Sequence, residues 1–345
     1  MKIKNISGYL MTIFALSLVA CGGGGGGNSG GSISPTPPAP VPSPSPSPSG
    51  GGTTGSWYCQ YTTSPTYLNT TVSSSSTAYV PISGGVTSYG YEACASSSSR
   101  TVTGNGIPNH VTGTFPSSND PNPLTTQSIS FITTLNPVES PGVTYLTRTP
   151  VGYLNNGVKL DPGTAATVCN NGTVVQAPTC PWNLEAIVPV ASTNVQANLG
   201  IDQCNGHTQP GGWYHYHGLP TCFISTVGNT ASTTITLIGW AADGFPIYNN
   251  YGYNDPNSSS STIRKMRPSW HLIPTSSISP ARQSLLATYP LGNFTQDYVY
   301  EAGYGDLDEC NGRIAVTPQF PQGIYQYYTT ESFPYIQRCI HGTNQ

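Results

Sequence analysis

Two histidines lie one residue apart in the stretch GGWYHYHGLPTC, residues 211–222, and each of them follows a tyrosine. The chain of 345 residues contains only six histidines. Side chains of residues i and i+2 project from the same face of a β-strand. His215 and His217 would therefore point one way, and Tyr214 and Tyr216 the other. Two neighbouring imidazoles can hold a metal ion, or they can be two rings of a packed core.

A third imidazole, that of His207, precedes this stretch in the motif CNGH. Three imidazole nitrogens with an open fourth position suit Zn(II) or Cu(II). His110, in GIPNH, is a further candidate donor, and Asp202 or Asp243 would accept the second N–H of a ligating imidazole. The alternative is a buried polar network in which the histidines bond to backbone carbonyls and tyrosine hydroxyls. The residues leave both interpretations open.

The segment that carries these histidines occurs twice. Residues 202–222 and residues 308–339 both read Asp-x-Cys-Asn-Gly, then Gly-x-Tyr-x-Tyr, and then a closing cysteine. This match indicates an internal duplication in which each copy closes its own disulfide, Cys204–Cys222 and Cys310–Cys339. A disulfide across a loop of that size stabilises a fold by about 3 kcal/mol in the chain-entropy model.

The second copy has no histidine at the three corresponding positions. Arg313 stands for His207, Gln326 for His215 and Tyr328 for His217. The repeated frame therefore does not require imidazoles for its packing, and the sequence predicts a metal site in the first copy only.

Nine cysteines are present, and eight of them follow residue 55. An even number in an exported chain indicates disulfides, and the absence of a CxxC pair disfavours a zinc ribbon or a thioredoxin-type site. Proximity in the sequence adds two further pairs to those of the repeats, Cys59–Cys94 and Cys169–Cys180.

Seven stretches occur in an order that is typical of one protein family. They are NGIPNHVTGTFP (105–116), GYLNNGVKLDP (152–162), CNGH (204–207), GGWYHYHGLP (211–220), GWAADGFPIY (239–248), LDECNGR (307–313) and FPYIQRC (333–339). The chain from about residue 100 to 345 thus resembles the YHYH domain family. The resemblance implies an exported protein with the fold of that family. Gln326 departs from the pattern, which disfavours a second, identical site.

The first 55 residues read as a targeting and spacer segment. A basic start and a short apolar run make residues 1–20 a signal peptide, and Leu-Val-Ala-Cys at its end resembles a bacterial lipobox. The resemblance implies a lipid on Cys21 that anchors the chain in the cell envelope, at the outer membrane or the cell surface. An ordinary secretory signal is the alternative. The Gly, Ser and Pro residues of 21–55 form a disordered linker, and the YHYH domain occupies residues 56–345.

The pattern of the domain predicts an all-β fold, a disulfide-stapled sandwich or barrel-like structure with very little helix. Short alternating runs at 127–132 and 234–240 are separated by turn clusters such as NNG at 155–157 and DG at 243–244. Only residues 280–288 resemble a short helix.

The composition and the motifs that are absent make some classes of function less expected than others. Charged residues make up 7% of the chain and no basic run occurs, so nucleic acid is not expected as a partner. No GxSxG motif is present, and the adjacent carboxylates Asp308 and Glu309 would face opposite sides of a strand, so catalysis is less expected than binding. The 22 tyrosines and 5 tryptophans suit the alternative of a cell-surface adhesive, glycan-binding or structural protein.

Overall fold

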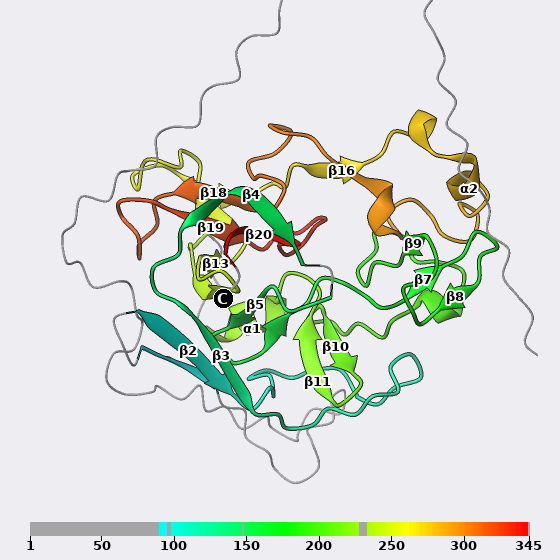
Figure 1. Cartoon of the computed structure of the whole chain (residues 1–345), viewed down its shortest axis with the longest axis horizontal. Helices are drawn as coiled ribbons and strands as arrows, with labels where there is room; N and C mark the ends of the chain where they lie inside the picture. Colours follow the sequence, from blue (N-terminus) through cyan, green and yellow to red (C-terminus); the bar gives the residue numbers. More distant parts are fainter. Residues whose placement is uncertain (1–89, 95–97, 147, 228–232, 344–345) are drawn as a thin grey trace, which may run out of the picture. The chain divides into compact units, whose positions relative to one another are not determined.

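The computed structural model describes residues 90–94, 98–146, 148–227 and 233–343 (Figure 1). They all belong to the second of two units, residues 54–345. The proposed signal peptide, Cys21, the linker and Cys59 lie outside the described residues. None of the helices in these ranges is long and apolar enough to cross a membrane.

An eight-stranded mixed sheet forms the centre of this unit, in the order β10-β11-β6-β5-β12-β13-β19-β18. Its strands are β5 (Gly152–Leu154), β6 (Lys159–Leu160), β10 (Gly206–Gln209), β11 (Trp213–Tyr216), β12 (Leu237–Ala241), β13 (Pro246–Tyr248), β18 (Gly312–Ala315) and β19 (Ile324–Tyr328).

The two halves of this sheet repeat one another. In the first half β10 and β11 form a hairpin, β11 runs parallel to β6, and β6 pairs with β5. In the second half β18 and β19 form a hairpin, β19 runs parallel to β13, and β13 pairs with β12. The halves join along β5 and β12, where Tyr153 lies opposite Trp240. The duplication therefore extends beyond the CNG segments to the hairpins GYLNNGVKL and GWAADGFPI, a correspondence that the sequence analysis missed.

Glycine is required where each CNG turn enters its hairpin. A Cβ atom on Gly206 would lie 2.4 Å from the hydroxyl oxygen of Tyr214, and one on Gly312 would lie 2.2 Å from that of Tyr325. The preceding asparagines, Asn205 and Asn311, both have a φ of 63°. Asparagine tolerates this left-handed conformation better than most residues do. The Asn-Gly pair thus gives the chain the same backbone conformation at the start of both hairpins.

Smaller sheets and short helices surround the central sheet. The other strands are β1 (Gly90–Ala93), β2 (Ser99–Gly104), β3 (Ile129–Thr134), β4 (Glu139–Tyr145), β7 (Thr167–Val168), β8 (Val174–Val175), β9 (Trp182–Asn183), β14 (Tyr251–Tyr253), β15 (Ile263–Lys265), β16 (Trp270–Leu272), β17 (Tyr298–Tyr300) and β20 (Cys339–Gly342). The helices are α1 (Thr221–Thr226) and α2 (Pro280–Gln283), with 3-10 turns η1 (Val195–Ala197), η2 (Thr275–Ser277) and η3 (Thr295–Asp297).

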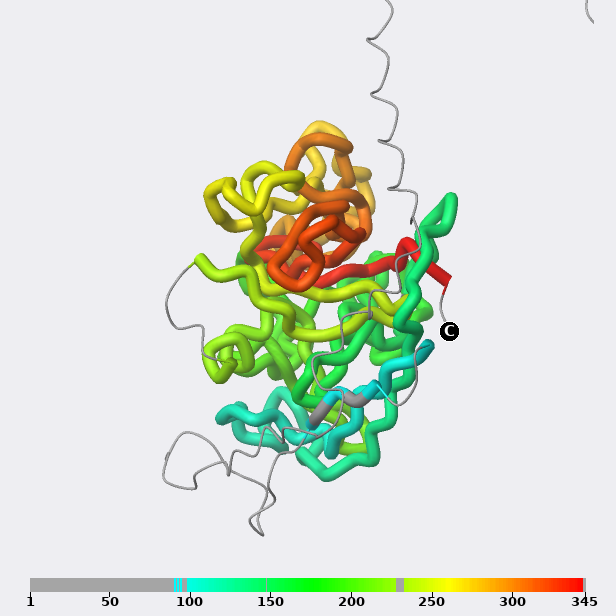
Figure 2. The backbone as a smooth tube through the Cα atoms, turned by 90° about the vertical axis from the view of Figure 1, so that its left-hand side faces the viewer, coloured from blue at the N-terminus to red at the C-terminus, as the bar shows by residue number. Residues whose placement is uncertain are grey.

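Figure 1 shows the β7–β9 group well apart from β2 and β3. In Figure 2 the chain near residue 110 (cyan) and the chain near residue 300 (orange) lie at opposite ends of the unit, with the central strands between them. The all-β fold with little helix that the sequence predicts is confirmed.

The largest buried cluster packs on the duplicated hairpins. It contains both tyrosines of each hairpin and the cysteines of both repeats, and its members include Cys204, Tyr214, Tyr216, Cys310, Tyr325, Tyr327 and Cys339. The pairs Cys204–Cys222, Cys310–Cys339 and Cys169–Cys180 are disulfide-bonded, as expected. Each CNG turn is thereby tied to the chain that follows its hairpin.

Helix α2 is shorter than the 280–288 expected from the sequence. Ser279 caps its first turn by accepting a hydrogen bond from the backbone N–H of Arg282, with Pro280 at the first helical position. The buried guanidinium of Arg282 then donates to the carbonyls of Tyr289 and Pro290, at 2.8 and 3.0 Å. Because of these hydrogen bonds, the residues after the helix form turns and do not continue the helix.

Candidate metal centre

Three histidine side chains of the first hairpin converge on one point. His207 of β10 lies directly opposite His215 of β11, and His217 follows β11 on the same face as His215. The Nε2 atoms of His215 and His217 are 2.9 Å apart, and those of His217 and His207 are 3.1 Å apart. One ring nitrogen from each residue lies within 4.8 Å of the other two. The three donors expected from the sequence are thus brought together.

The other ring nitrogen of each histidine faces a backbone carbonyl. The Nδ1 atoms face the oxygens of Leu199 (2.5 Å, His207), Trp213 (3.4 Å, His215) and Pro162 (3.4 Å, His217). A carbonyl oxygen can only accept, so these contacts favour the tautomer that has its proton on Nδ1, in which Nε2 presents its lone pair. Lone pairs that face one another at 2.9 and 3.1 Å repel unless a cation or a proton lies between them. Nδ1–H bonds to carbonyls are also the usual second partner of metal-ligating histidines.

Burial keeps these imidazoles neutral. His215 and His217 are each 3% exposed, and this desolvation lowers the pKa of both well below 6.5. The neighbouring histidines and the ammonium of Lys159 lower both pKa values further. Burial also lowers the pKa of His207, although Asp120 and other carboxylates oppose the shift. A neutral imidazole is the form that binds a metal.

Among the three histidines, the side chain of His207 is the most accessible to solvent. Its side chain is 14% exposed, whereas those of the other two are almost fully buried. An ion would therefore enter at the β10 edge of the central sheet.

Asp120 is a carboxylate beside the histidines that the sequence analysis missed. Its Oδ2 lies 3.8 Å from Nδ1 of His207 and accepts hydrogen bonds from the backbone N–H and the hydroxyl of Thr208, at 2.9 and 2.8 Å. Asp120 precedes His207 by more than 80 residues, and no motif of the sequence marks it.

Asp202 and Asp243, the two carboxylates considered as outer partners of the histidines, have hydrogen-bond partners elsewhere. Asp202 accepts from the hydroxyl of Tyr214 at 2.9 Å and from backbone N–H groups of its own turn. Asp243 belongs to the second half, where it accepts from the hydroxyl of Tyr327 at 2.5 Å and from the backbone N–H of Gly342 at 2.9 Å.

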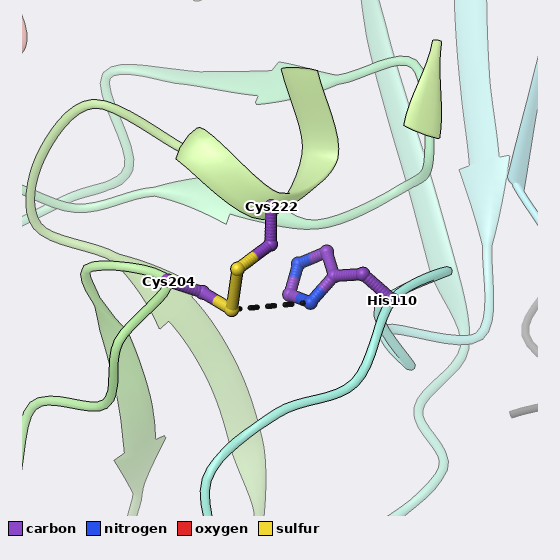
Figure 3. A group of neighbouring side chains, drawn as sticks. All are labelled: His110, Cys204 and Cys222. Carbon is purple, nitrogen blue, oxygen red and sulfur yellow. Dashed lines mark hydrogen bonds between the residues drawn. A yellow bond between two sulfur atoms is a disulfide. The ribbon is translucent and has the colours of Figure 1, made fainter. Parts of the chain in front are cut away.

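His110 lies on the tyrosine side of β11, away from the three converging nitrogens. Its Nε2 is 2.5 Å from the hydroxyl oxygen of Tyr216, and its ring packs against Tyr214 and Tyr216. Figure 3 shows its Nδ1 facing the Cys204–Cys222 disulfide, 3.5 Å from Sγ of Cys204. The structure does not place His110 as a fourth donor to the histidine group.

Two more groups of potential ligands each contain a disulfide sulfur. They are His110 with Cys204 and Cys222, and Asp308 with Cys310 and His341. The thiolate is the form of cysteine that binds metals, and these sulfurs are oxidised. The all-histidine group is therefore the candidate metal centre among the described residues.

The second half fills the equivalent place with a different hydrogen-bond network. Arg313 lies opposite Gln326 in the β18–β19 ladder. The side-chain amide of Gln326 donates to the hydroxyl of Tyr328, and the guanidinium of Arg313 lies 5.4 Å from the Tyr328 ring centroid and donates to the carbonyl of Tyr253 at 2.6 Å. A fixed cation thus occupies the place in the second half where the first half has its three converging imidazoles.

The chain also matches a family model along most of this structure. The model, described as "YHYH protein", matches residues 130–342, which include both hairpins and all three converging histidines, but not His110. No curated protein and no solved structure matches the chain. Because the match covers more than half of the chain, the chain belongs to the YHYH protein family.

Proposed function

We propose that this protein binds one divalent transition-metal ion, Zn(II) or Cu(II), through Nε2 of His207, His215 and His217. One observation carries the proposal. The three Nε2 atoms converge within 4.8 Å, while each Nδ1 faces a carbonyl oxygen that can only accept. With the ring protons on Nδ1, directed at these carbonyls, no donor lies between the Nε2 atoms, and a metal ion would satisfy their lone pairs.

The spacing of the nitrogens supports an ion of this size. Ligands bound tetrahedrally at zinc–nitrogen distances of 2.0–2.1 Å are about 3.3–3.4 Å apart. The observed separations of 2.9 and 3.1 Å need only a small outward movement of the rings. Three uncharged nitrogen donors favour zinc or copper over magnesium and calcium, which prefer oxygen.

The adhesive alternative has less support. A binding platform for glycans would need several exposed aromatic rings in a row. Among the described residues, the strongly exposed large apolar side chains include only two aromatic ones, Tyr145 and Tyr304. Tyr145 ends β4 and Tyr304 follows β17, so the two do not form a row along one strand.

Metal analysis of the purified full-length chain tests the proposal. After zinc or copper loading and dialysis, the wild-type protein should retain one ion per chain, and the double variant His215→Ala, His217→Ala should retain none. Gln326→Ala changes the matched position of the second half and serves as the control. Equal metal content in wild type and double variant would show that the histidines form a core network.

We further propose that the metal site is displayed outside the cytoplasm on a lipid-anchored chain. The support comes from the apolar run and Leu-Val-Ala-Cys motif that precede residue 22, and from the disulfides Cys169–Cys180, Cys204–Cys222 and Cys310–Cys339 among the described residues. Disulfides of this kind persist in oxidising compartments.

A further inference from the structure

A lysine and an aspartate share the sheet face of the converging histidines. In the parallel ladder of β6 and β11, Lys159 lies beside His215. The backbone N–H of Asp161 donates to the carbonyl of Tyr216 at 3.0 Å, which continues the ladder and places Asp161 beside His217. Residues that alternate along a strand share one face, so Lys159 and Asp161 project to the side of the two histidines.

Lys159 and Asp161 form a buried ion pair. The ammonium of Lys159 donates to Oδ2 of Asp161 at 2.8 Å and to the side-chain oxygen of Gln209 at 2.7 Å. Both charged side chains are at least nine-tenths buried. Burial of a charged pair costs desolvation that its attraction does not always repay, so such a pair is weak evidence of a purely stabilising role.

The ion pair is confined to the half that has the histidines. In the second half, Ile247 and Tyr248 of β13 lie beside Tyr327 and Tyr328 of β19. By this register, Pro246 corresponds to Lys159, and Tyr248 to Asp161. The fold therefore does not need a charged pair at this place in the sheet, just as it does not need the imidazoles.

One carboxylate oxygen of Asp161 lacks a partner. Its Oδ1 is fully buried and accepts no hydrogen bond from any described residue. An unsatisfied buried oxygen on an ionised carboxylate is unfavourable unless a donor reaches it. No carboxylate oxygen belongs to the group of nitrogens that lie within 4.8 Å of one another. Asp161 is thus beside the histidines but is not one of the converging donors.

We propose, resting on the metal site proposed above, that a water molecule fills the fourth coordination position and donates a hydrogen bond to Oδ1 of Asp161. Asp161 is a positioning residue for this water, and Lys159 fixes Asp161. An exchangeable fourth ligand distinguishes a reactive zinc centre from a structural one, whose four protein ligands close it. The ligands that replace this water must be small, because even His207, the most exposed of the three histidines, has a side chain that is only 14% exposed.

Azide binding to the Co(II)-loaded full-length chain tests this inference. Cobalt at such a site has a visible spectrum that changes when its fourth ligand changes. We expect azide to alter the spectrum of the wild type.

In Asp161→Asn the amide oxygen takes over the bond to Lys159, and its N–H group faces the fourth ligand. Replacing an acceptor by a donor should strengthen azide binding about tenfold or more, the difference expected of one charge-assisted hydrogen bond. Tyr248→Phe, at the matched position of the second half, should bind azide as the wild type does.

The possible outcomes separate the two proposals. Absence of bound cobalt, or equal cobalt content in the His215→Ala, His217→Ala variant, refutes the metal site itself. Bound cobalt with a spectrum that azide leaves unchanged, or equal azide affinity in wild type and Asp161→Asn, refutes the water and Asp161 assignment alone. Loss of cobalt from a folded Asp161→Asn also overturns it, because Asp161 would then be a direct ligand.

A measurement on the wild type covers the case in which Asp161→Asn does not fold. Electron–nuclear double resonance of the Cu(II)-loaded chain in H2O and D2O should show strongly coupled exchangeable protons from a bound water. Their absence contradicts the inference.

Discussion

His207 lies directly opposite His215 in the antiparallel ladder of β10 and β11. The same register in β18 and β19 places Arg313 opposite Gln326. One backbone arrangement therefore supports two different side-chain sets, a converging group of neutral nitrogens in one half and a guanidinium with an amide in the other. This comparison within one chain supplies the matched control positions Gln326 and Tyr248 used above, and it suggests the substitution His215→Gln.

The single change His215→Gln gives the first half the residue that the second half has at Gln326. We expect this variant to lose at least about 100-fold in zinc affinity, because an amide replaces a neutral imidazole donor. Its metal-free unfolding free energy should change by less than about 2 kcal/mol, since glutamine occupies the equivalent buried place in β19. Zinc titration and denaturant unfolding measure the two quantities. A large loss of stability with unchanged zinc affinity would contradict this expectation.

Zinc should remain bound well below pH 6.5. Imidazole must be neutral to ligate, and burial lowers the pKa of both His215 and His217 below 6.5. Protonation of the folded site therefore begins only at more acidic pH than in a free histidine. Zinc release into a chelator, followed from pH 7 to pH 4, checks this. Half-release above pH 6.5 would be inconsistent with these lowered pKa values.

The lowered pKa values of His215 and His217 also predict how the unfolding free energy of the metal-free protein depends on pH. The unfolded chain binds protons at its histidines near pH 6.5, whereas the folded chain binds them only at lower pH. The stability that these residues contribute is present in full above about pH 6.5 and is lost as the pH falls toward their folded pKa values. Denaturant unfolding at pH 7.5 and pH 5.5 should show this loss, and it should be smaller in His215→Gln.

Removal of the Cys204–Cys222 disulfide should weaken both the fold and metal binding. This disulfide closes a loop with a sequence separation of 18 residues, and Cys204→Ala, Cys222→Ala should lower the unfolding free energy by about 3 kcal/mol. Without this disulfide the CNG turn that precedes β10 is no longer cross-linked to the chain after the hairpin, so the position of His207 is less well fixed. The matched control is Cys169→Ala, Cys180→Ala, whose disulfide lies at β7 to β9 and should leave zinc affinity unchanged. Equal zinc affinity in both double variants would refute the coupling.

Gly206→Ala should disrupt the first hairpin. The added Cβ would lie 2.4 Å from the hydroxyl oxygen of Tyr214, so strand β10 must shift, at a cost of about 1–3 kcal/mol. We expect a lower melting temperature and weaker zinc binding, because His207 follows Gly206 directly. Gly142→Ala, in β4, is the control, since nothing lies within 4 Å of its added Cβ. Similar melting temperatures for both variants would argue against a tight contact at Gly206.

The converging histidines could be predicted because they depend on local rules. Alternation along one strand places His215 and His217 on one face, and a hairpin after the CNG turn brings His207 across. The repeat disulfides follow from the same local frame. Asp120, Lys159 and Asp161 were missed because strands or turns far apart in the sequence bring them to the site. Parallel pairing of β6 with β11, in particular, has no signature in either short segment.

The larger duplication was missed for a different reason. GYLNNGVKL and GWAADGFPI share only their glycines and an aromatic residue, so the repeat is visible chiefly in the strand order. Helix α1 likewise escaped notice, because its six residues, TCFIST, are too few to show a helical period. Lipidation of Cys21 remains a prediction, which mass spectrometry of the membrane-bound chain would check.

The sheet of two equivalent halves has a consequence for how an ion would be handled. In small zinc domains the apo chain is unfolded, so binding and folding are one event. Here the second half forms the same hairpin around Arg313, without a histidine group, and β5 and β12 join it to the first half. At the proposed site, uptake and discharge of an ion would then proceed on a preassembled scaffold and would need no refolding of the chain.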